Sequence, residues 1–235
     1  MNKTLNLNIP EIETGSGSTT QDHVYRRLRN AIMLGAIEPG TSLTMRGLAE
    51  HLDLSPTPVR EALRRLSSEH AVEVMGNRRM IIPEMTPGKF EELVALRVTL
   101  EVHAAVRSLP YVSDILIEEL TGLDDEMDRL VEARDLDALT LRNQEFHRIL
   151  YAANAHQASM PVIESVWLQL GPFQRQVIKK VAEFYLIDRH KEILEALRQR
   201  DAQALSAAIE GDIRDGLLHS GRELLQRGPA PDRAA

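Results

Sequence analysis

The sequence contains no cysteine, few aromatic residues and no long apolar run. Without cysteine the chain can form no disulfide, thiolate metal site or cysteine nucleophile, a composition compatible with a reducing cytosol. No apolar stretch approaches the roughly 18 residues of a membrane span, and the first twenty residues lack the apolar segment of a signal peptide. We therefore expect a cytoplasmic protein that does not enter the membrane.

The composition favours helix, and the charge is unevenly distributed. Aromatic residues make up only 4% of the chain, whereas leucine, alanine, glutamate and arginine are abundant. The net charge is −7, but residues 23–82 hold nine arginines against six acidic residues, and residues 83–235 carry a net charge of −8. A basic head on an acidic body predicts that only the head contacts a polyanion.

The head is predicted to be a winged helix-turn-helix. An amphipathic helix ends near Gly35, and two short helices follow on either side of a break at residues 53–55. Ser55 stands at the N-cap of the last helix, with Pro56 at the first helical position. Two β-rich runs, residues 72–75 and 79–82, predict a hairpin wing with Gly76 and Asn77 in its turn.

From residue 88 onward the pattern is helical, so the protein is expected to be mainly α, with an antiparallel all-helical bundle of about six to seven helices after the head. Pro172 should kink or split the fourth of these helices. The predicted helices span roughly residues 88–108, 113–134, 135–153, 159–183, 185–200 and 201–226. The predicted organisation is a flexible arm (1–20), the winged domain (21–82), a linker (83–87), the helical domain (88–226) and a frayed tail (227–235).

The last helix of the head presents arginines on the side opposite its apolar face. Thr57, Arg60 and Arg64 point outward, and arginine can bridge guanine O6 and N7 in the major groove. Arginines elsewhere in the head can contact phosphates, which fix register without reading sequence; these are Arg26, Arg78 and Arg79. The alternative is a solvated charged face in which these arginines pair with acids such as Glu61.

Four polar residues interrupt apolar stripes in the helical domain. Asn143 and His147 lie on the buried face of one helix, His190 on that of a second and Asp212 on that of a third. Each alone could be a hydrogen-bonded core residue, but an unpaired buried carboxylate costs several kcal/mol. If the helices meet, a shared divalent cation explains all four, and Zn²⁺, Ni²⁺, Mn²⁺ or Fe²⁺ suit these ligands better than Ca²⁺.

Arg97 also lies on an apolar stripe and therefore points inward. A buried guanidinium requires a carboxylate, which could come from Glu101 one turn later or from a bound ligand. Trp167 is a candidate for lining the same ligand pocket, although its apolar neighbours equally suit a core position.

The stretch LSPTPVREALRRL, residues 54–66, with the wing and helical body that follow, resembles the GntR family of bacterial transcription regulators, specifically the FadR-like subfamily with an FCD ligand-binding domain. The resemblance extends from residue 21 to about residue 225. It implies DNA contacts by Arg46, Ser55, Thr57, Arg60 and the wing tip around Gly76 and Asn77. Pro56 stands where some relatives have a further base-contacting arginine.

The resemblance also implies a divalent metal site in the FCD domain. His147 and His190 match the family pattern directly, whereas Asn143 stands where an aspartate is usual and Asp212 where the last histidine is usual. The two departures together retain two imidazoles and one carboxylate. In the family the arginine equivalent to Arg97 borders the effector pocket, which implies a small carboxylate held between Arg97 and the metal.

These patterns predict a homodimeric transcription factor, a repressor, that binds a pseudo-palindromic double-stranded operator and responds to a small organic acid. One alternative is a metal-dependent enzyme with an accessory DNA-binding head, although the sequence has no HExxH motif. Another is a regulator for which the metal itself is the signal.

Overall fold

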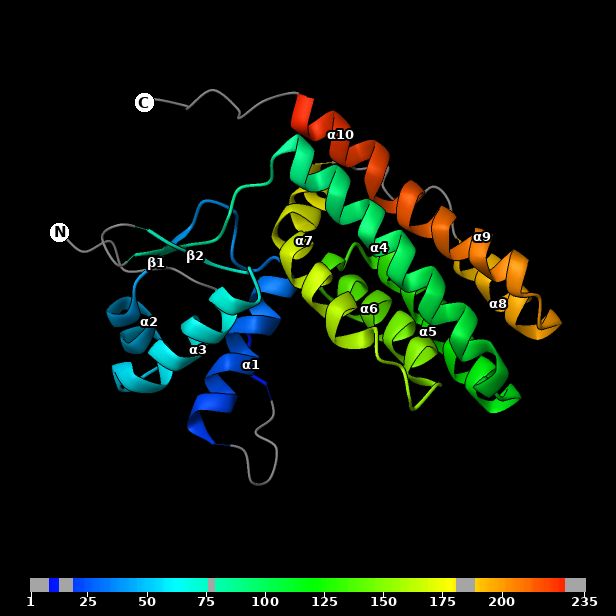
Figure 1. Cartoon of the computed structure of the whole chain (residues 1–235), viewed down its shortest axis with the longest axis horizontal. Coiled ribbons are helices and arrows are strands. Elements are labelled where there is room, and N and C mark those ends of the chain that lie inside the picture. The colour runs from blue at the N-terminus through cyan, green and yellow to red at the C-terminus, as the bar shows by residue number, and fades with distance from the viewer. Residues whose placement is uncertain (1–8, 13–18, 76–78, 181–188, 227–235) are drawn as a thin grey trace. The chain divides into compact units, whose positions relative to one another are not determined.

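The structure, a computed structural model, describes residues 9–12, 19–75, 79–180 and 189–226. The chain divides into two compact units (Figure 1). The first unit comprises Met1–Met85 and Trp167–Gln176, and the second comprises Thr86–Val166 and Val177–Ala235.

Besides the segment Trp167–Gln176, the described part of the first unit contains three helices and a small sheet. The helices are α1 (Thr20–Met33), α2 (Met45–His51) and α3 (Pro56–Ser68), and the strands are β1 (Ser42–Leu43), β2 (Glu73–Val74) and β3 (Met80–Ile81). The antiparallel sheet has the order β1-β3-β2, so the predicted wing strands pair and a third strand joins them. The two residues of β1 are too few to give a strand pattern, and the sequence did not predict them.

The core of the first unit forms where α1 packs on α3. The apolar stripe of α1 is fully buried, as is that of α3, which confirms the predicted amphipathic faces. The residues concerned are Val24, Leu28, Ile32, Val59, Leu63 and Leu66. Ser55 occupies the N-cap position of α3 as predicted, but its side chain makes no capping hydrogen bond.

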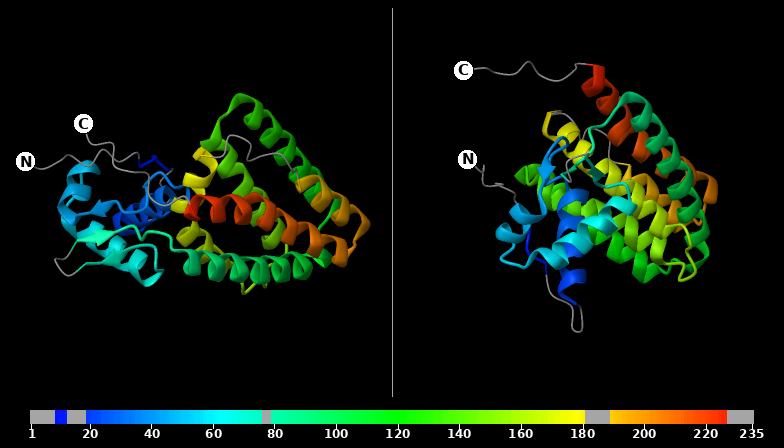
Figure 2. Two further views of the ribbon diagram at one scale, coloured as in Figure 1. Left: turned by 90° about the horizontal axis from the view of Figure 1, so that it is seen from above. Right: turned by 60° about the vertical axis from the view of Figure 1, so that its left-hand side comes forward.

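The second unit is helical, as predicted. Its elements are α4 (Pro87–Ser108), the 3₁₀ turn η1 (Leu109–Tyr111), α5 (Asp114–Ala133), α6 (Leu136–Ala152), α8 (His190–Gln199), α9 (Ala202–Ile213), the π-helical turn η2 (Arg214–Leu218) and α10 (His219–Gln226). Helix α4 packs on α6 and along α9, and α8 packs on α5 and α9 (Figure 2). The sequence predicted one helix over residues 201–226, whereas the structure inserts a π-helical turn within it.

Helix α7 (Met160–Lys180) continues through Pro172, so of the two predicted outcomes, a kink or a split, the structure excludes the split. Leu168, Leu170 and Phe173 are buried on both sides of the proline. Burial of these side chains offsets the roughly 3 kcal/mol that a proline costs inside a helix. In the described chain, no helix is long and apolar enough to cross a membrane.

The N-terminal arm was predicted to be flexible, but residues 9–12 contact the first unit. Ile9 is buried, its carbonyl accepts a hydrogen bond from Arg27, and Arg27 also forms an ion pair with Glu11. Ile9 and Glu11 therefore contact α1, while flexibility of the arm stays a prediction. The rest of the predicted arm before residue 19 and the predicted tail, residues 227–235, lie outside the described residues.

Two glycines allow the end of α1 to approach α7 within the first unit. Gly35 follows α1 with φ +65°, a conformation that glycine adopts without strain. A Cβ atom at Gly171 would lie 2.1 Å from the carbonyl oxygen of Met33, so no side chain fits there. The contact therefore requires glycine at position 171.

Gly171→Ala should destabilise the protein by about 1–3 kcal/mol, because the new methyl group would force two backbones apart. Gly122→Ala is the matched control: Gly122 also lies inside a helix, but its added Cβ would meet nothing within 4 Å. That substitution should leave stability unchanged or raise it by up to about 1 kcal/mol. Urea unfolding measures both, and equal stabilities of the two variants would refute the close approach.

Candidate functional site

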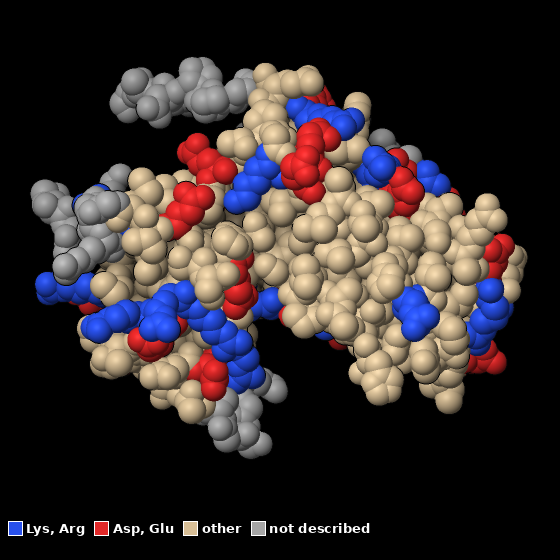
Figure 3. Space-filling model, viewed as in Figure 1, with Lys and Arg blue, Asp and Glu red and all other residues tan. Residues whose placement is uncertain are grey.

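The outward face of α3 carries positive charge that the protein does not neutralise. Thr57, Arg60 and Arg64 are all exposed, and none has a hydrogen bond or ion pair within the described parts of the chain. Arg60 and Arg64 therefore do not pair with Glu61, which was the alternative interpretation of this face. Figure 3 shows Lys and Arg side chains gathered on the surface of the first unit.

Other arginines of the first unit are already engaged. Arg65 lies 3.7 Å above the ring of Tyr25 and forms ion pairs with Asp22 and Glu69, which indicates a structural role. Arg46 is 84% exposed but pairs with Glu50 one turn later, at 2.9 Å.

Some of the other predicted DNA contacts lie within the described residues, and some lie outside them. Ser55 and Arg26 are exposed. Gly76, Asn77 and Arg78, at the predicted wing tip, lie outside the described residues.

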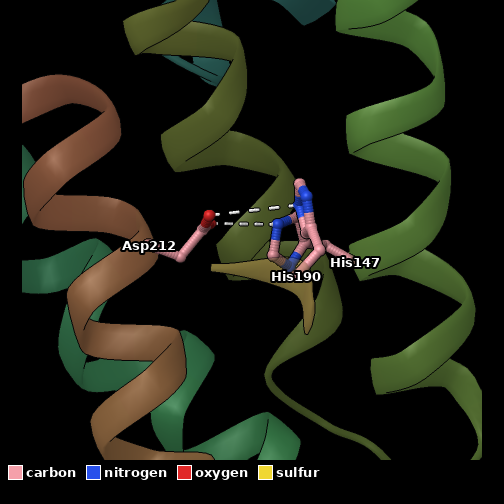
Figure 4. A group of neighbouring side chains, drawn as sticks. All are labelled: His147, His190 and Asp212. Atoms are coloured by element: carbon pink, nitrogen blue, oxygen red, sulfur yellow. Dashed lines mark ion pairs between the residues drawn. The ribbon is translucent and has the colours of Figure 1, made fainter. Parts of the chain in front are cut away.

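The second unit brings three of the predicted metal ligands together (Figure 4). His147 of α6, His190 at the start of α8 and Asp212 of α9 offer ligand atoms that all lie within 4.8 Å of one another. The Nε2 atom of His147 lies 3.2 Å from Asp212 Oδ2, and the Nε2 atom of His190 lies 3.9 Å from Asp212 Oδ1. Both imidazoles are buried, and the Asp212 side chain is 16% exposed.

The hydrogen bonds behind His147 fix which of its nitrogens carries a proton. The Tyr151 hydroxyl donates to Glu101 Oε2 at 2.9 Å, and its oxygen lies 3.2 Å from His147 Nδ1. A hydroxyl has only one proton, so toward His147 the Tyr151 oxygen can only accept, and Nδ1 must donate. A neutral ring then leaves Nε2 as a bare lone pair, and this buried atom has no hydrogen-bond partner among the described residues.

His190 has a similar arrangement. Its Nδ1 lies 3.5 Å from Oδ1 of Asp124, a carboxylate that is 3% exposed on α5. Its Nε2 lies 3.1 Å from the amide nitrogen of Asn143. The nitrogen and oxygen of an amide have nearly the same shape, so a half turn of the Asn143 side chain would place its oxygen at the same position. Asn143 is thus adjacent to the three clustered ligands.

The geometry and charge of this cluster fit a divalent cation. Ligands about 2.1 Å from a metal lie about 3–4 Å from one another, and the two imidazole–carboxylate distances are 3.2 and 3.9 Å. Burial by itself would raise the pKa of Asp212, but His147 and His190, when they carry a second proton, and Arg97 lower it to about 2. Asp212 is therefore a carboxylate ready to bind a cation.

Arg97 is buried on α4 and forms the internal ion pair that the sequence left open. Its Nε donates to Glu101 Oε1 at 2.6 Å. Burial would lower the pKa of Arg97, but the charge of Glu101, its hydrogen bond and the charges of Asp212 and Tyr151 together outweigh burial and raise the pKa above its usual value. Nη1 and Nη2 of Arg97 have no protein acceptor within the described parts of the chain.

The structure does not place Trp167 in the effector pocket that was predicted beside Arg97. Trp167 is buried and groups with the first unit, whereas Arg97 groups with the second. Its role in effector binding remains a prediction.

Sequence reasoning missed two residues that surround the metal-ligand cluster. Asp124 interrupts the buried stripe of α5 formed by Ile117, Leu120 and Met127, and this pattern was a usable signal. Tyr151 stands four residues after His147 and so lies on the same helix face. A tyrosine on an apolar face is common, so its position alone did not reveal the contact.

Comparisons with known proteins agree with this architecture. Residues 20–82 match the family described as bacterial regulatory proteins, gntR family, and residues 92–215 match the FCD domain. The chain is 27% identical over 214 residues to the HTH-type transcriptional regulator McbR of Escherichia coli strain K12, covering 88% of this chain and 90% of that protein. It is 25% identical over 228 residues to the gluconate operon transcriptional repressor of Bacillus subtilis strain 168, covering 91% and 92%.

Solved structures share the fold. Escherichia coli McbR/YncC superposes with a TM-score of 0.81 at 24% identity, covering 88% of this chain and 99% of that one. The regulator GntR from Rhodococcus sp. RHA1 superposes with a TM-score of 0.73 at 21% identity, covering 90% and 100%. The matched families and relatives are regulators rather than enzymes, so the metalloenzyme alternative is set aside. The chain belongs to the GntR family of transcriptional regulators, in the FadR-like subfamily that carries an FCD domain.

Proposed function

We propose that this regulator is a homodimeric repressor that binds a pseudo-palindromic operator and is controlled by a small organic acid bound beside a divalent metal. The proposal that α3 reads DNA is supported by its exposed face, where Arg60 and Arg64 have no partner within the described protein. Arginines held on a rigid helix and free of internal acids can form bidentate contacts with guanine. Similarity to the gluconate operon repressor supports repression.

The metal proposal rests on the electrostatics of the cluster. A neutral His147 with its proton on Nδ1 would point the Nε2 lone pair at Asp212 Oδ2 from 3.2 Å. A lone pair facing a buried carboxylate is unfavourable unless a positive charge lies between them. A cation bound by His147, His190 and Asp212 supplies that charge. Two imidazoles and a carboxylate favour Zn²⁺, with Ni²⁺, Mn²⁺ and Fe²⁺ as alternatives.

The effector proposal rests on Arg97. Its guanidinium is buried, yet only Nε is used by Glu101, so the two terminal nitrogens can form a bidentate pair with a small carboxylate. Asp212 contributes to the pKa of Arg97, so the guanidinium lies within electrostatic reach of the cluster. An acid that binds one arrangement of the dimer more tightly shifts the population toward it and changes operator binding.

The homodimer proposal rests on the outer face of α4. Between Glu92 and Arg107 the only Asp, Glu, Lys or Arg residues of this helix are Arg97 and Glu101, and both are buried. The exposed side chains there are uncharged and include Leu96 at 42% exposure. Figure 3 shows a broad area without charged side chains on this part of the second unit. An uncharged face of this kind fits a second copy of the chain, since isologous contacts avoid like charges.

Arg60→Ala should weaken operator binding by about 1–3 kcal/mol and relax selection at one base position. The Kd would be measured with an operator selected from random double-stranded DNA. Arg129→Ala is the control, because Arg129 is exposed on α5 of the other unit. Operator affinity that is the same for both variants would count against DNA reading by α3.

Untagged protein should contain about one divalent metal ion per chain by elemental analysis, and His147→Ala and His190→Ala should lose it. Asn143→Asp should bind Zn²⁺ at least about tenfold more tightly, because it adds a negative ligand. His103→Ala is the control, because His103 is exposed on α4.

Two outcomes bear on alternatives to this metal site. Absence of stoichiometric metal after incubation with Zn²⁺, Ni²⁺ and Mn²⁺ would remove the metal from the proposal. If chelation alone abolishes operator binding, the metal itself is the signal.

Leu96→Asp should convert the dimer into a monomer at micromolar concentration, because it would place two like charges in an apolar contact. Leu141→Asp is the matched control, since Leu141 on α6 is 43% exposed, close to the 42% of Leu96. Sedimentation equilibrium measures the mass of both variants. A Leu96→Asp variant that stays dimeric would exclude this face as the interface.

A further inference from the structure

A hydrogen-bonded chain of three residues adjoins His147 at its Nδ1 atom. Arg97 donates to one oxygen of Glu101 at 2.6 Å, and Tyr151 donates to the other at 2.9 Å. The Tyr151 oxygen then lies 3.2 Å from His147 Nδ1. The side chains of Glu101, His147 and Tyr151 are all fully buried, so water does not compete for these contacts.

We propose that Glu101 and Tyr151 are positioning residues for the metal centre, which together hold the proton of His147 on Nδ1 and so keep Nε2 free as a metal ligand. This inference rests on the proposed metal site. The Tyr151 hydroxyl donates its single proton in the hydrogen bond to Glu101. Toward His147, the Tyr151 oxygen can therefore only accept a hydrogen bond. The ring must then donate from Nδ1, and its lone pair is directed at the space beside Asp212. An outer hydrogen bond of this kind fixes the tautomer of a ligating histidine.

The charges around the chain favour this direction of hydrogen bonding. Arg97 stabilises Glu101 as a carboxylate, and a carboxylate is a stronger acceptor than a neutral imidazole nitrogen. Without Tyr151 the better acceptor for the His147 proton would be Asp212, 3.2 Å from Nε2. Removing the hydroxyl should therefore move the proton to the nitrogen that the metal requires.

The chain also connects the two functions proposed for this unit. Arg97, the proposed contact for the effector carboxylate, shares Glu101 with Tyr151. An anion that pairs with Arg97 competes with Glu101 for the same guanidinium. Arg97 and the metal ligand His147 are therefore linked by hydrogen bonds through one carboxylate and one hydroxyl.

The test uses the full-length protein and Zn²⁺ alone. In metal-free protein at about pH 8, long-range ¹H–¹⁵N spectra should show His147 with its proton on Nδ1. In Tyr151→Phe the proton should move to Nε2, and Zn²⁺ affinity by chelator competition should fall about 10- to 100-fold. Glu101→Gln, a second variant that keeps the Tyr151 hydroxyl, should weaken Zn²⁺ binding in the same range.

The matched control is Tyr25→Phe. The Tyr25 hydroxyl also donates a hydrogen bond to a glutamate, Glu69, and this pair lies in the first unit. The Zn²⁺ affinity of this variant should stay within about twofold of the wild type. Equal Zn²⁺ affinities for Tyr151→Phe and Tyr25→Phe would overturn the inference, as would a wild-type His147 that is protonated on Nε2 or on both nitrogens. Failure of the wild type to bind Zn²⁺ would instead remove the proposed metal, while the tautomer still decides the role of Tyr151.

Discussion

The second unit depends on how it accommodates one negative charge, that of Asp212. The carboxylate lies between two buried imidazoles that come from different helices, and its pKa is lowered to about 2 when these imidazoles are protonated. A neutral imidazole does not compensate a carboxylate, so the folded unit is complete only when a proton or a cation joins the cluster. The packing of α6, α8 and α9 therefore creates the negative charge that the proposed cation would neutralise.

Much of this arrangement followed from helical periodicity. Asn143, His147, His190 and Asp212 each fall on an apolar stripe, so their inward direction was predictable from spacing alone. That three helices meet at those residues is a property of packing, and no single stripe contains it. The donor direction at Tyr151 was less accessible still, because it depends on Glu101, fifty residues away in sequence and on another helix. Elements of two residues, such as β1, and the π-helical turn η2 leave no pattern long enough to recognise.

The two units use arginine in opposite ways. In the first unit Arg60 and Arg64 of α3 have no internal partner in the described structure, which leaves their charge for a polyanion. In the second unit Arg97 is buried and held by Glu101, so its charge orients groups inside the protein. Whether the arginines of α3 pair with acids or stay available to DNA depends on where the acidic side chains lie in the fold. The sequence alone could not show this.

Helix α4 reverses the usual distribution of charge in a protein. Its two mid-helix ions lie inside, and the side chains opposite them, which face water in the single chain, carry none. Such a helix is poorly suited to the edge of a molecule, because its outer face gains little from hydration. In the proposed dimer both faces become interior, and α4 would lie at the centre of the assembly. The Arg97–Glu101 pair would then stand one helix diameter from the symmetry axis, which is about 10 Å.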